Sequence, residues 1–342
     1  MLFEDGAPFE SLNDADLDRT HFIVDDRVAN LYRDALAGIL QAPSVLRIVA
    51  SENAKSLDRF PAYVGALVAH KVRRGHRLIA IGGGVIQDIA CFLAATLLRG
   101  LDWSFYPTTL LAQADSCIGS KSSINVGHIK NILGTFTPPS EIRINSAVLA
   151  TLDPIEVRSG IGEMLKVHAI DGPEAFDRIA TDYPVMLSDL SALARYVRSS
   201  LLLKRRFVEE DEFDQGKRRV MNYGHSFGHA IESATRFEVP HGIAVTIGMD
   251  MANYVAWQLG VCSRELFERM HPPLAANYGE FRKLSASVDD VLAALVQDKK
   301  NVDNRLTLIL PGADGRPQVG SYSNDAAFRS LCAEYLRAPR LA

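Results

Sequence analysis

The chain has 342 residues, of which 47% are apolar and 23% are charged, and its formal net charge at pH 7 is -4. This length exceeds what one hydrophobic core usually organises, so two domains are expected. The net negative charge argues against a nucleic-acid-binding protein, because such proteins present a basic face to the phosphates.

The first part of the chain alternates strand patterns with helix patterns. Strands are predicted at His21–Asp25, Val45–Val49, Leu78–Ile81 and Trp103–Tyr106, and helices at Leu31–Leu40 and Phe60–Lys71. Strands that alternate with helices predict parallel βαβ units. We therefore expect an α/β, Rossmann-like domain with a parallel sheet over residues 1–153.

The pattern changes after Asp153, where long helical periods dominate. We expect a mostly α-helical domain over residues 154–342. Its predicted helices are Pro154–Ile170, Leu190–Glu210, Tyr223–Thr235, Gly242–Leu259 and Val288–Asp298. The segment Asn301–Leu310 is predicted to form a short strand or hairpin before a last helix.

The cysteines and the N-terminus indicate the cellular compartment. The four cysteines form no CxxC pair, which argues against a disulfide scaffold and against a thiolate zinc site. The acidic N-terminus lacks a signal-peptide pattern, and no segment approaches about 20 consecutive apolar residues. A cytoplasmic protein is expected.

A glycine turn follows one of the predicted strands. Leu78–Ile81 continues into Gly82, Gly83 and Gly84, and a helical stretch begins at Val85. A strand, a glycine turn and a helix bring backbone N–H groups and the positive end of a helix onto a phosphate. The pattern is not GxGxxG, so a simple tight turn is the alternative.

Histidines and one glutamate form the candidate metal site. His225 and His229 are four residues apart and share a helix face, while His241 is placed in a loop before the next helix. Glu163 and Lys166 lie three apart among apolar neighbours. A divalent metal needs about three N or O ligands, one of them commonly a carboxylate. Structural histidines and a surface glutamate are the alternative, and the spacing does not choose between His225 and His229.

Several segments together resemble the 3-dehydroquinate synthase family, within the sugar-phosphate cyclase superfamily. They occur in the family's order between residues 20 and 310. The segments are Gly82–Gly100, Pro107–Asn125, Lys130–Asn131, Gly162–Lys166, Arg218–Glu232, His241–Gly242 and Asp298–Asn301.

The resemblance implies a set of site residues. NAD would be bound by Asp25, Glu52, Lys55, Gly83, Gly84, Asp88, Thr108 and Thr109. A divalent metal, zinc or cobalt, would be held by Glu163, His225 and His241. The catalytic residues would be Lys121, Lys166, Lys204, Arg218, Asn222 and His229. Further substrate contacts would come from Asp115, Lys130, Asn131, one of Lys299 or Lys300, and Arg99, which would reach across a homodimer interface.

The implied activity is that of a lyase of the shikimate pathway of aromatic amino acid biosynthesis. It converts 3-deoxy-D-arabino-heptulosonate 7-phosphate to 3-dehydroquinate by transient oxidation with NAD, β-elimination of phosphate, re-reduction and an intramolecular aldol step. A substrate with a carboxylate and a phosphate requires several local cations. The alternatives are a paralogous cyclase for sedoheptulose 7-phosphate, glucose 6-phosphate or an amino analogue, and a metal-dependent alcohol or glycerol dehydrogenase of the same fold.

Some positions depart from the family pattern. Gln87 and Ser120 stand where glycines are usual, Arg27 stands where a small amide is common, and residues 126–129 replace a different loop. These positions flank the expected cofactor and phosphate sites, so they bear on the choice of substrate.

Overall fold

The computed structural model describes residues 1–127, 129–297 and 305–337. The chain divides into two compact units, Met1–Leu152 and Asp153–Ala342, called here the N-terminal and the C-terminal unit. Within the described residues, no helix is both long enough and apolar enough to cross a membrane.

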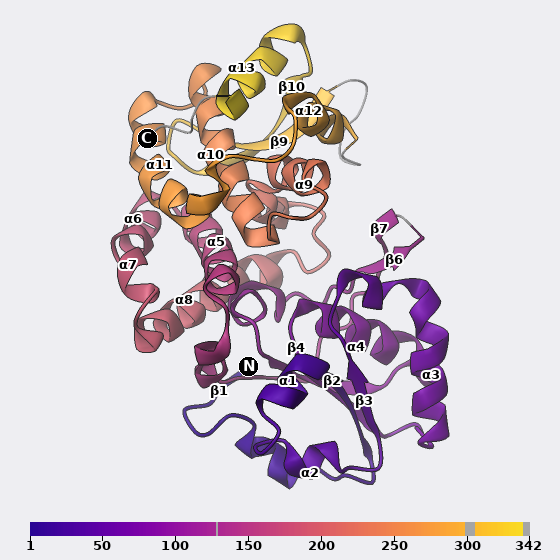
Figure 1. Ribbon diagram of the computed structural model, residues 1–342. Coiled ribbons are helices and arrows are strands. Elements are labelled where there is room, and N and C mark those ends of the chain that lie inside the picture. The colour runs from indigo at the N-terminus through magenta and orange to yellow at the C-terminus, as the bar shows by residue number, and fades with distance from the viewer. Residues whose placement is uncertain (128, 298–304, 338–342) are drawn as a thin grey trace. The chain divides into compact units, whose positions relative to one another are not determined.

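A six-stranded parallel sheet forms the centre of the N-terminal unit (Figure 1). Its order is β1-β8-β5-β4-β2-β3, with bounds Leu2–Phe3, Glu141–Ile144, Asp102–Pro107, Arg77–Gly82, Thr20–Asp25 and Val45–Ile48. In the register, Phe22 is paired with Val45 on one side and with Ile79 on the other. The central strands are apolar and buried, which is typical of a parallel sheet covered on both faces. The four predicted strands are confirmed, each to within one residue at either end.

Short helical elements connect these strands. The α-helices are α1 (Asp26–Leu31), α2 (Ala37–Leu40), α3 (Phe60–Ala69) and α4 (Gly84–Thr96). The 3-10 turns are η1 (Glu10–Asp14), η2 (Glu52–Lys55), η3 (Leu57–Arg59), η4 (Leu97–Arg99) and η6 (Ser146–Thr151), and η5 (Ala112–Ser116) is π-helical. A small antiparallel hairpin consists of β6 (Ile124–Val126) and β7 (Ile129–Leu133).

The prediction of one helix over Leu31–Leu40 was wrong. The Asp25 side chain accepts a hydrogen bond from the backbone N–H of Arg27 and starts α1 directly after β2. That helix ends at Leu31, and only Ala37–Leu40 forms α2.

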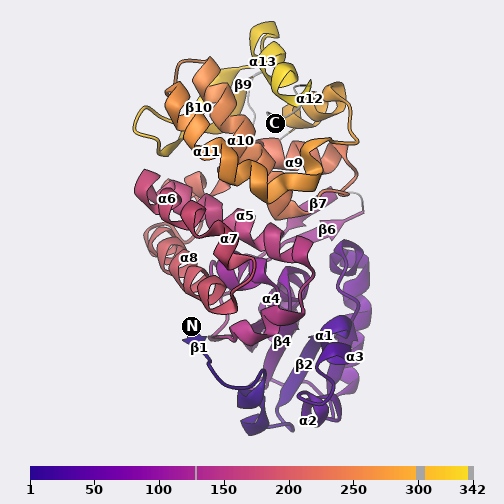
Figure 2. The same ribbon diagram turned by 60° about the vertical axis from the view of Figure 1, so that its left-hand side comes forward.

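Helices make up most of the C-terminal unit (Figure 2). Its α-helices are α5 (Pro154–Asp171), α6 (Pro173–Thr181), α7 (Tyr183–Met186), α8 (Leu190–Glu210), α9 (His225–Ala234), α10 (His241–Gln258), α11 (Arg264–Tyr278), α12 (Val288–Val296) and α13 (Ala326–Arg337). The 3-10 turns η7 (Lys217–Asn222) and η8 (Gly279–Arg282) and the antiparallel hairpin β9 (Arg305–Pro311) and β10 (Pro317–Ser323) complete the unit. The five predicted helices are present, with their described ends within two residues of the predicted ones, and the predicted hairpin is present from Arg305 onwards.

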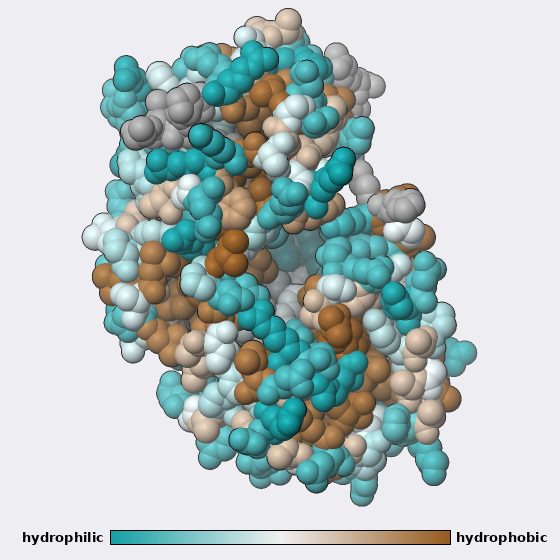
Figure 3. Space-filling view, in the orientation of Figure 1, coloured by the Kyte–Doolittle hydropathy of each residue, from teal (hydrophilic) through white to brown (hydrophobic). Residues whose placement is uncertain are grey.

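Helix α10 is the core of the C-terminal unit, since all its residues from Gly242 to Ala256 are buried. Its Asp250 carboxylate accepts hydrogen bonds from His271 Nδ1 at 2.9 Å, Tyr278 Oη at 2.8 Å and Tyr335 Oη at 2.7 Å. These contacts tie α10 to α11 and α13. Hydrophilic side chains, teal in Figure 3, cover much of the visible surface of both units.

Candidate active site

The glycine turn of the N-terminal unit leads from β4 into α4. A Cβ at Gly83 would lie 2.8 Å from Cγ2 of Thr109, so this backbone packs directly against the Thr108–Thr109 segment. Thr108 N–H also donates to Gly82 O at 2.9 Å. Because α4 begins at Gly84, its first backbone N–H groups point out of the turn, where an anion is favoured.

Gln87, one of the departures, fastens α4 to η5. Its Nε2 donates to Ser116 O at 2.6 Å, and Ser116 Oγ donates to its Oε1 at 2.6 Å. The π-helical turn η5 carries Asp115, a predicted substrate contact. Such π-helical turns occur frequently at functional sites. The Gln87–Ser116 hydrogen bonds stabilise this turn.

Lys55 lies at the centre of a charged cluster that joins predicted cofactor residues. Its Nζ lies 2.9 Å from Asp88 Oδ2, 3.0 Å from Asn131 Oδ1 and 3.4 Å from Glu52 Oε1. Burial raises the pKa of Asp88, while the charge and hydrogen bond of Lys55 and the Ser123 N–H act in the opposite direction. Lys55 therefore contacts both of the other predicted residues, Glu52 and Asp88.

The predicted substrate lysines of this unit lie on and before the β6–β7 hairpin. Lys130 Nζ is 4.0 Å from Glu52 Oε1. Lys121 Nζ is 5.9 Å from the centre of the Phe136 ring, within the range of a cation–π contact. Ser120, which replaces a glycine, has φ +58°, and Asn131 has φ +51°. Non-glycine residues in this region are strained and concentrate at functional sites.

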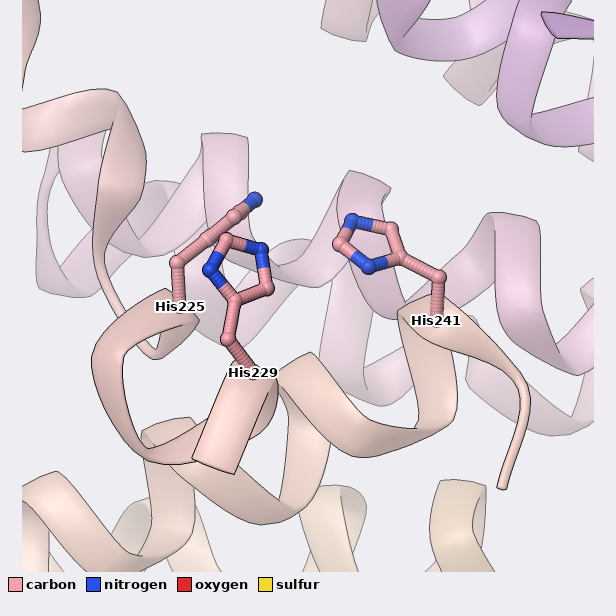
Figure 4. A group of neighbouring side chains, drawn as sticks. All are labelled: His225, His229 and His241. Carbon is pink, nitrogen blue, oxygen red and sulfur yellow. The ribbon is translucent and has the colours of Figure 1, made fainter. Parts of the chain in front are cut away.

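Three imidazoles and one carboxylate converge in the C-terminal unit. His225 and His229 of α9 and His241 of α10 point toward one another (Figure 4), with ligand-type nitrogens all within 4.8 Å. Glu163 Oε1 of α5 lies 3.9 Å from His225 Nε2 and 3.5 Å from His241 Nε2. His241 is the first residue of α10, so its predicted place in a loop was wrong by one position.

Glycines explain how three helices bring these side chains together. A Cβ at Gly162 would lie 2.2 Å from Gly242 O, and a Cβ at Gly248 would lie 2.0 Å from Gly224 O. Backbones therefore touch where α5 meets α10 and where α9 meets α10. Three of these glycines are chain neighbours of Glu163, His225 and His241, so close helix packing sets the distance between the candidate ligands.

Glu163 is 1% exposed, and its carboxylate oxygens accept no hydrogen bond of ordinary geometry from the described residues. Oε2 forms an ion pair with Lys166, which leaves Oε1 facing the imidazoles. Burial holds the pKa of His225 well below its ordinary value, assisted by the charge of Lys166 and by His229 and His241. A neutral imidazole offers a nitrogen lone pair, so this donor set fits a divalent metal such as Zn²⁺ or Co²⁺.

Glu232 of α9 is an additional member of the cluster that the sequence analysis missed. Its Oε2 lies 3.1 Å from His241 Nδ1. Burial lowers the pKa of His241, but the hydrogen bond and charge of Glu232, with the charge of Glu163, leave it raised. When Glu232 accepts a hydrogen bond from Nδ1–H, the Nε2 lone pair on the side of Glu163 is left for a metal. The sequence spacing could have indicated this position, because Glu232 is three residues after His229 and so lies on the same face of the helix.

Three cations are buried in the same unit. Lys166 is 2% exposed, Lys204 of α8 is 8% exposed and Arg218 of η7 is 5% exposed. Arg218 Nη1 donates to Glu212 O at 2.6 Å, and the next candidate, Asn222, ends the same turn. Lysine and arginine side chains are seldom buried in proteins, so each of the three is a candidate to meet an anionic ligand.

One predicted residue, Arg99, forms no hydrogen bond or ion pair with these clusters within the described part of the chain. Arg99 is exposed at the end of η4, and it and Leu98 have positive φ angles of +68° and +53°. Lys299 and Lys300 lie outside the described residues.

Comparisons with known proteins agree over most of the chain. The family model "3-dehydroquinate synthase N-terminal" matches residues 45–159, and "3-dehydroquinate synthase C-terminal" matches residues 160–301. A 3-dehydroquinate synthase of Cereibacter sphaeroides is 36% identical over 325 residues, covering 92% of this chain and 88% of that protein.

Solved structures share the fold. A 2-epi-5-epi-valiolone synthase from Streptomyces hygroscopicus, with NAD+ and Zn2+ bound, has a TM-score of 0.82 at 27% identity, covering 98% of this chain and 95% of that one. A 2-deoxy-scyllo-inosose synthase with carbaglucose-6-phosphate, NAD+ and Co2+ has a TM-score of 0.82 at 21% identity, with the same coverage.

Proposed function

The chain belongs to the 3-dehydroquinate synthase family, and from this premise we propose that it converts 3-deoxy-D-arabino-heptulosonate 7-phosphate to 3-dehydroquinate. The reaction releases inorganic phosphate and closes a carbocycle. It has no net redox change, because the hydride removed from the substrate is returned.

One observation carries the proposal: a buried carboxylate faces two imidazoles and pairs with a buried lysine. Glu163 Oε1 lies within 3.9 Å of both His225 Nε2 and His241 Nε2, and Lys166 lies next to them. These residues supply the donors for a divalent metal and positive charge for an anionic substrate in one place. A simple metal-dependent alcohol dehydrogenase has no need of the further buried cations Lys204 and Arg218.

The metal and NAD would each contribute one kind of chemistry. A divalent metal lowers the pKa of an oxygen bound to it, as it does for water, where the value falls from ~15.7 to about 7. NAD supplies a reversible hydride acceptor. We assign the metal to Glu163, His225 and His241, with His229 directed to the substrate.

The chain's own residues would bind and orient the substrate and the nucleotide. Lys121, Lys130 and His229 are proposed to hold the phosphate, and Arg218 and Asn222 to hold the carboxylate through charge-assisted hydrogen bonds. Lys166 and Lys204 add positive charge, and Asp115 and Asn131 add polar contacts. Asp25 and Glu52 would accept hydrogen bonds from ribose hydroxyls, with Lys55, Asp88, Thr108 and Thr109 around them, while Gly83, Gly84 and the start of α4 would receive the pyrophosphate.

The two units would divide this work, with the nucleotide on the N-terminal unit and the metal on the C-terminal unit. We also propose a homodimer in which Arg99 reaches the partner, supported by its exposure and its strained backbone. Four free cysteine thiols support a reducing, cytoplasmic location. Light scattering after size-exclusion chromatography would test the dimer, because a monomer at working concentration contradicts it.

Product identification tests the activity. The protein is incubated with NAD, zinc or cobalt, and each of the heptulosonate phosphate, sedoheptulose 7-phosphate and glucose 6-phosphate. Phosphate release is measured, and the carbocycle is identified by NMR. We expect 3-dehydroquinate from the first substrate and no steady accumulation of NADH. Turnover of a carboxylate-free sugar alone would instead assign a paralogous cyclase, and stoichiometric NADH would assign a dehydrogenase.

A further inference from the structure

Four residues of the N-terminal unit form a closed ring of hydrogen bonds and one ion pair. Asn125 Nδ2 donates to Glu52 Oε1 at 2.8 Å, and Asn131 N–H donates to Asn125 Oδ1 at 2.9 Å. Lys55 Nζ donates to Asn131 Oδ1 at 3.0 Å and lies 3.4 Å from Glu52 Oε1, which closes the ring.

The ring has an outer and an inner pair. Asn125 and Lys55 are each 6% exposed. Asn131 is exposed, and the Glu52 side chain is 41% exposed, so this carboxylate can accept a further hydrogen bond from a ligand. Of the outer pair, Glu52 is assigned to the cofactor and Asn131 to the substrate. The buried pair therefore joins two groups that meet different ligands.

Other contacts attach the same hairpin to the cofactor segment. Asn125 makes a parallel backbone bridge with Ser56, directly after η2, and its Nδ2 also lies 3.2 Å from Glu52 O. The ring thus holds Asn131, whose φ of +51° is unfavourable for a non-glycine residue, through both its N–H and its side chain. Lys130 is the chain neighbour of Asn131, so the position of the ring sets the position of the substrate-binding end of β7.

We infer that this ring couples the two binding events, so that NAD binding at Glu52 holds Asn131 and its neighbour Lys130 in place for the substrate phosphate, with Asn125 as the positioning residue. The inference rests on the proposed function for the identity of the two ligands. Coupling of this kind is reciprocal: the substrate raises the affinity for NAD by the same factor by which NAD raises the affinity for the substrate. Ordering of a shared segment by the first ligand is its physical basis.

The test measures binding without turnover. The dissociation constant of NAD is determined by titration calorimetry with and without a phosphonate analogue of the heptulosonate, in which a methylene group replaces the ester oxygen so that phosphate cannot leave. For the unmodified holoenzyme we expect the analogue to tighten NAD binding by about 10-fold, within the usual range of allosteric coupling. In Asn125→Ala the factor should fall below about 2-fold.

Asn145→Ala is the matched control. Asn145 is also a buried asparagine of this unit, and it also accepts one backbone hydrogen bond, from Ala147 N, and donates one, to Gly6 O. Its removal should leave the coupling factor unchanged. Asn125→Asp serves as a second variant of nearly equal volume: it retains the acceptor for Asn131 N–H but loses the donor to Glu52, so it should also lose coupling.

Hydrogen exchange on the unmodified protein gives a readout that needs no variant. NAD alone should slow deuterium uptake in β6 and β7, residues 124–126 and 129–133, which a purely structural role of Asn125 would not require. A coupling factor near 1 in the unmodified protein, unchanged coupling in Asn125→Ala, or no change in exchange on NAD binding would each overturn the inference while leaving the proposed function standing. Failure of NAD to bind at all would overturn both.

Discussion

The two units position their candidate ligand-binding side chains by different means. In the N-terminal unit, hydrogen bonds between side chains hold Glu52, Lys55 and Asn131 in place. In the C-terminal unit, backbone contact at Gly162 and Gly242 sets how closely the helices that carry Glu163 and His241 approach. The first arrangement can respond to a ligand, whereas the second is fixed before any ligand arrives, as electrostatic preorganisation requires.

The two units also differ in how many cationic side chains they bury. Lys55 is surrounded by the acceptors Glu52, Asp88 and Asn131, so its positive charge is compensated inside the protein. The C-terminal unit buries three cationic side chains, Lys166, Lys204 and Arg218, whereas Lys55 is the one that the described part of the N-terminal unit buries. We therefore expect ligand removal and charge removal to have their larger effects in the C-terminal unit.

The largest effect is expected from removal of a metal ligand. His241→Ala should lose both bound metal and turnover, because Nε2 of His241 faces Glu163 Oε1 at 3.5 Å. Metal content is measured by mass spectrometry and turnover by phosphate release. The exposed His70 of the N-terminal unit supplies the control His70→Ala, which should retain both. Full activity of His241→Ala with no bound metal would refute the ligand assignment.

Removal of the buried guanidinium should come next. In Arg218→Ala we expect kcat/KM for the heptulosonate to fall by about 10- to 100-fold, since a hydrogen bond to a charged group contributes ~1.5–3 kcal/mol. The exposed neighbour Arg219 supplies the control. In Arg219→Ala, kcat/KM for the heptulosonate should stay within about 2-fold of the unmodified value. Equal losses in the two variants would mean that burial in η7 is not what matters.

A substitution at Glu232 tests whether its contact with His241 Nδ1 positions that candidate metal ligand. Glu232→Ala should weaken metal binding by about 10- to 100-fold, the usual effect of losing a carboxylate on a ligating histidine. Competition with a chelator gives the affinity, and the absorption spectrum of the Co²⁺ form reports the coordination geometry.

Two further variants separate this positioning role from a structural one. Glu232→Gln keeps an acceptor for His241 Nδ1 and should recover most of the affinity. Glu238→Gln changes a nearby glutamate that accepts from Ser285 Oγ instead, so it should leave the cobalt spectrum unchanged. An altered melting temperature with unaltered metal affinity in Glu232→Ala would contradict the assignment.

The smallest effects should come from single methyl groups at the helix contact. Gly162→Ala would place a Cβ 2.2 Å from Gly242 O, and we expect a loss of about 1–3 kcal/mol in the free energy of unfolding. Gly65→Ala in α3 meets nothing within 4 Å and should gain about 0.4–1 kcal/mol. Denaturant unfolding of both measures the difference, and equal stabilities would mean that α5 shifts freely against α10.

The sequence predicted the sheet centre and the long helices because their signals are local. Val24 and Ile81, for example, belong to apolar runs that only a buried strand accommodates. Strand β8, between β1 and β5, has a charged residue at alternate positions, and the strands of the β6–β7 hairpin are short and largely exposed, so neither has such a run. The helix expected at Leu31–Leu40 failed because the cap at Asp25 starts the helix earlier than its apolar residues suggest.

The site residues that belong to recognisable local motifs could be predicted from the sequence. Those whose role depends on a contact with a distant residue could not. The residues themselves indicated a cluster of histidines with Glu163, the resemblance chose Glu163, His225 and His241 from it, and the structure brings these side chains together. Asn125 was not singled out, because its partner Glu52 is 73 residues away and an isolated asparagine has no distinguishing pattern. Such a role arises from tertiary contact alone.

Asp250 links the last helix to the helix that begins at His241, which makes α13 a poor place to shorten the protein for expression. A variant truncated before Ala326 would remove the Tyr335 hydroxyl and leave a fully buried carboxylate with one donor fewer. A lost hydrogen bond to a buried group costs about 1–3 kcal/mol, and more when the group is charged. We therefore expect a shortened protein to differ from the full chain in metal affinity and turnover. The activity of the enzyme should be measured on a protein that retains α13.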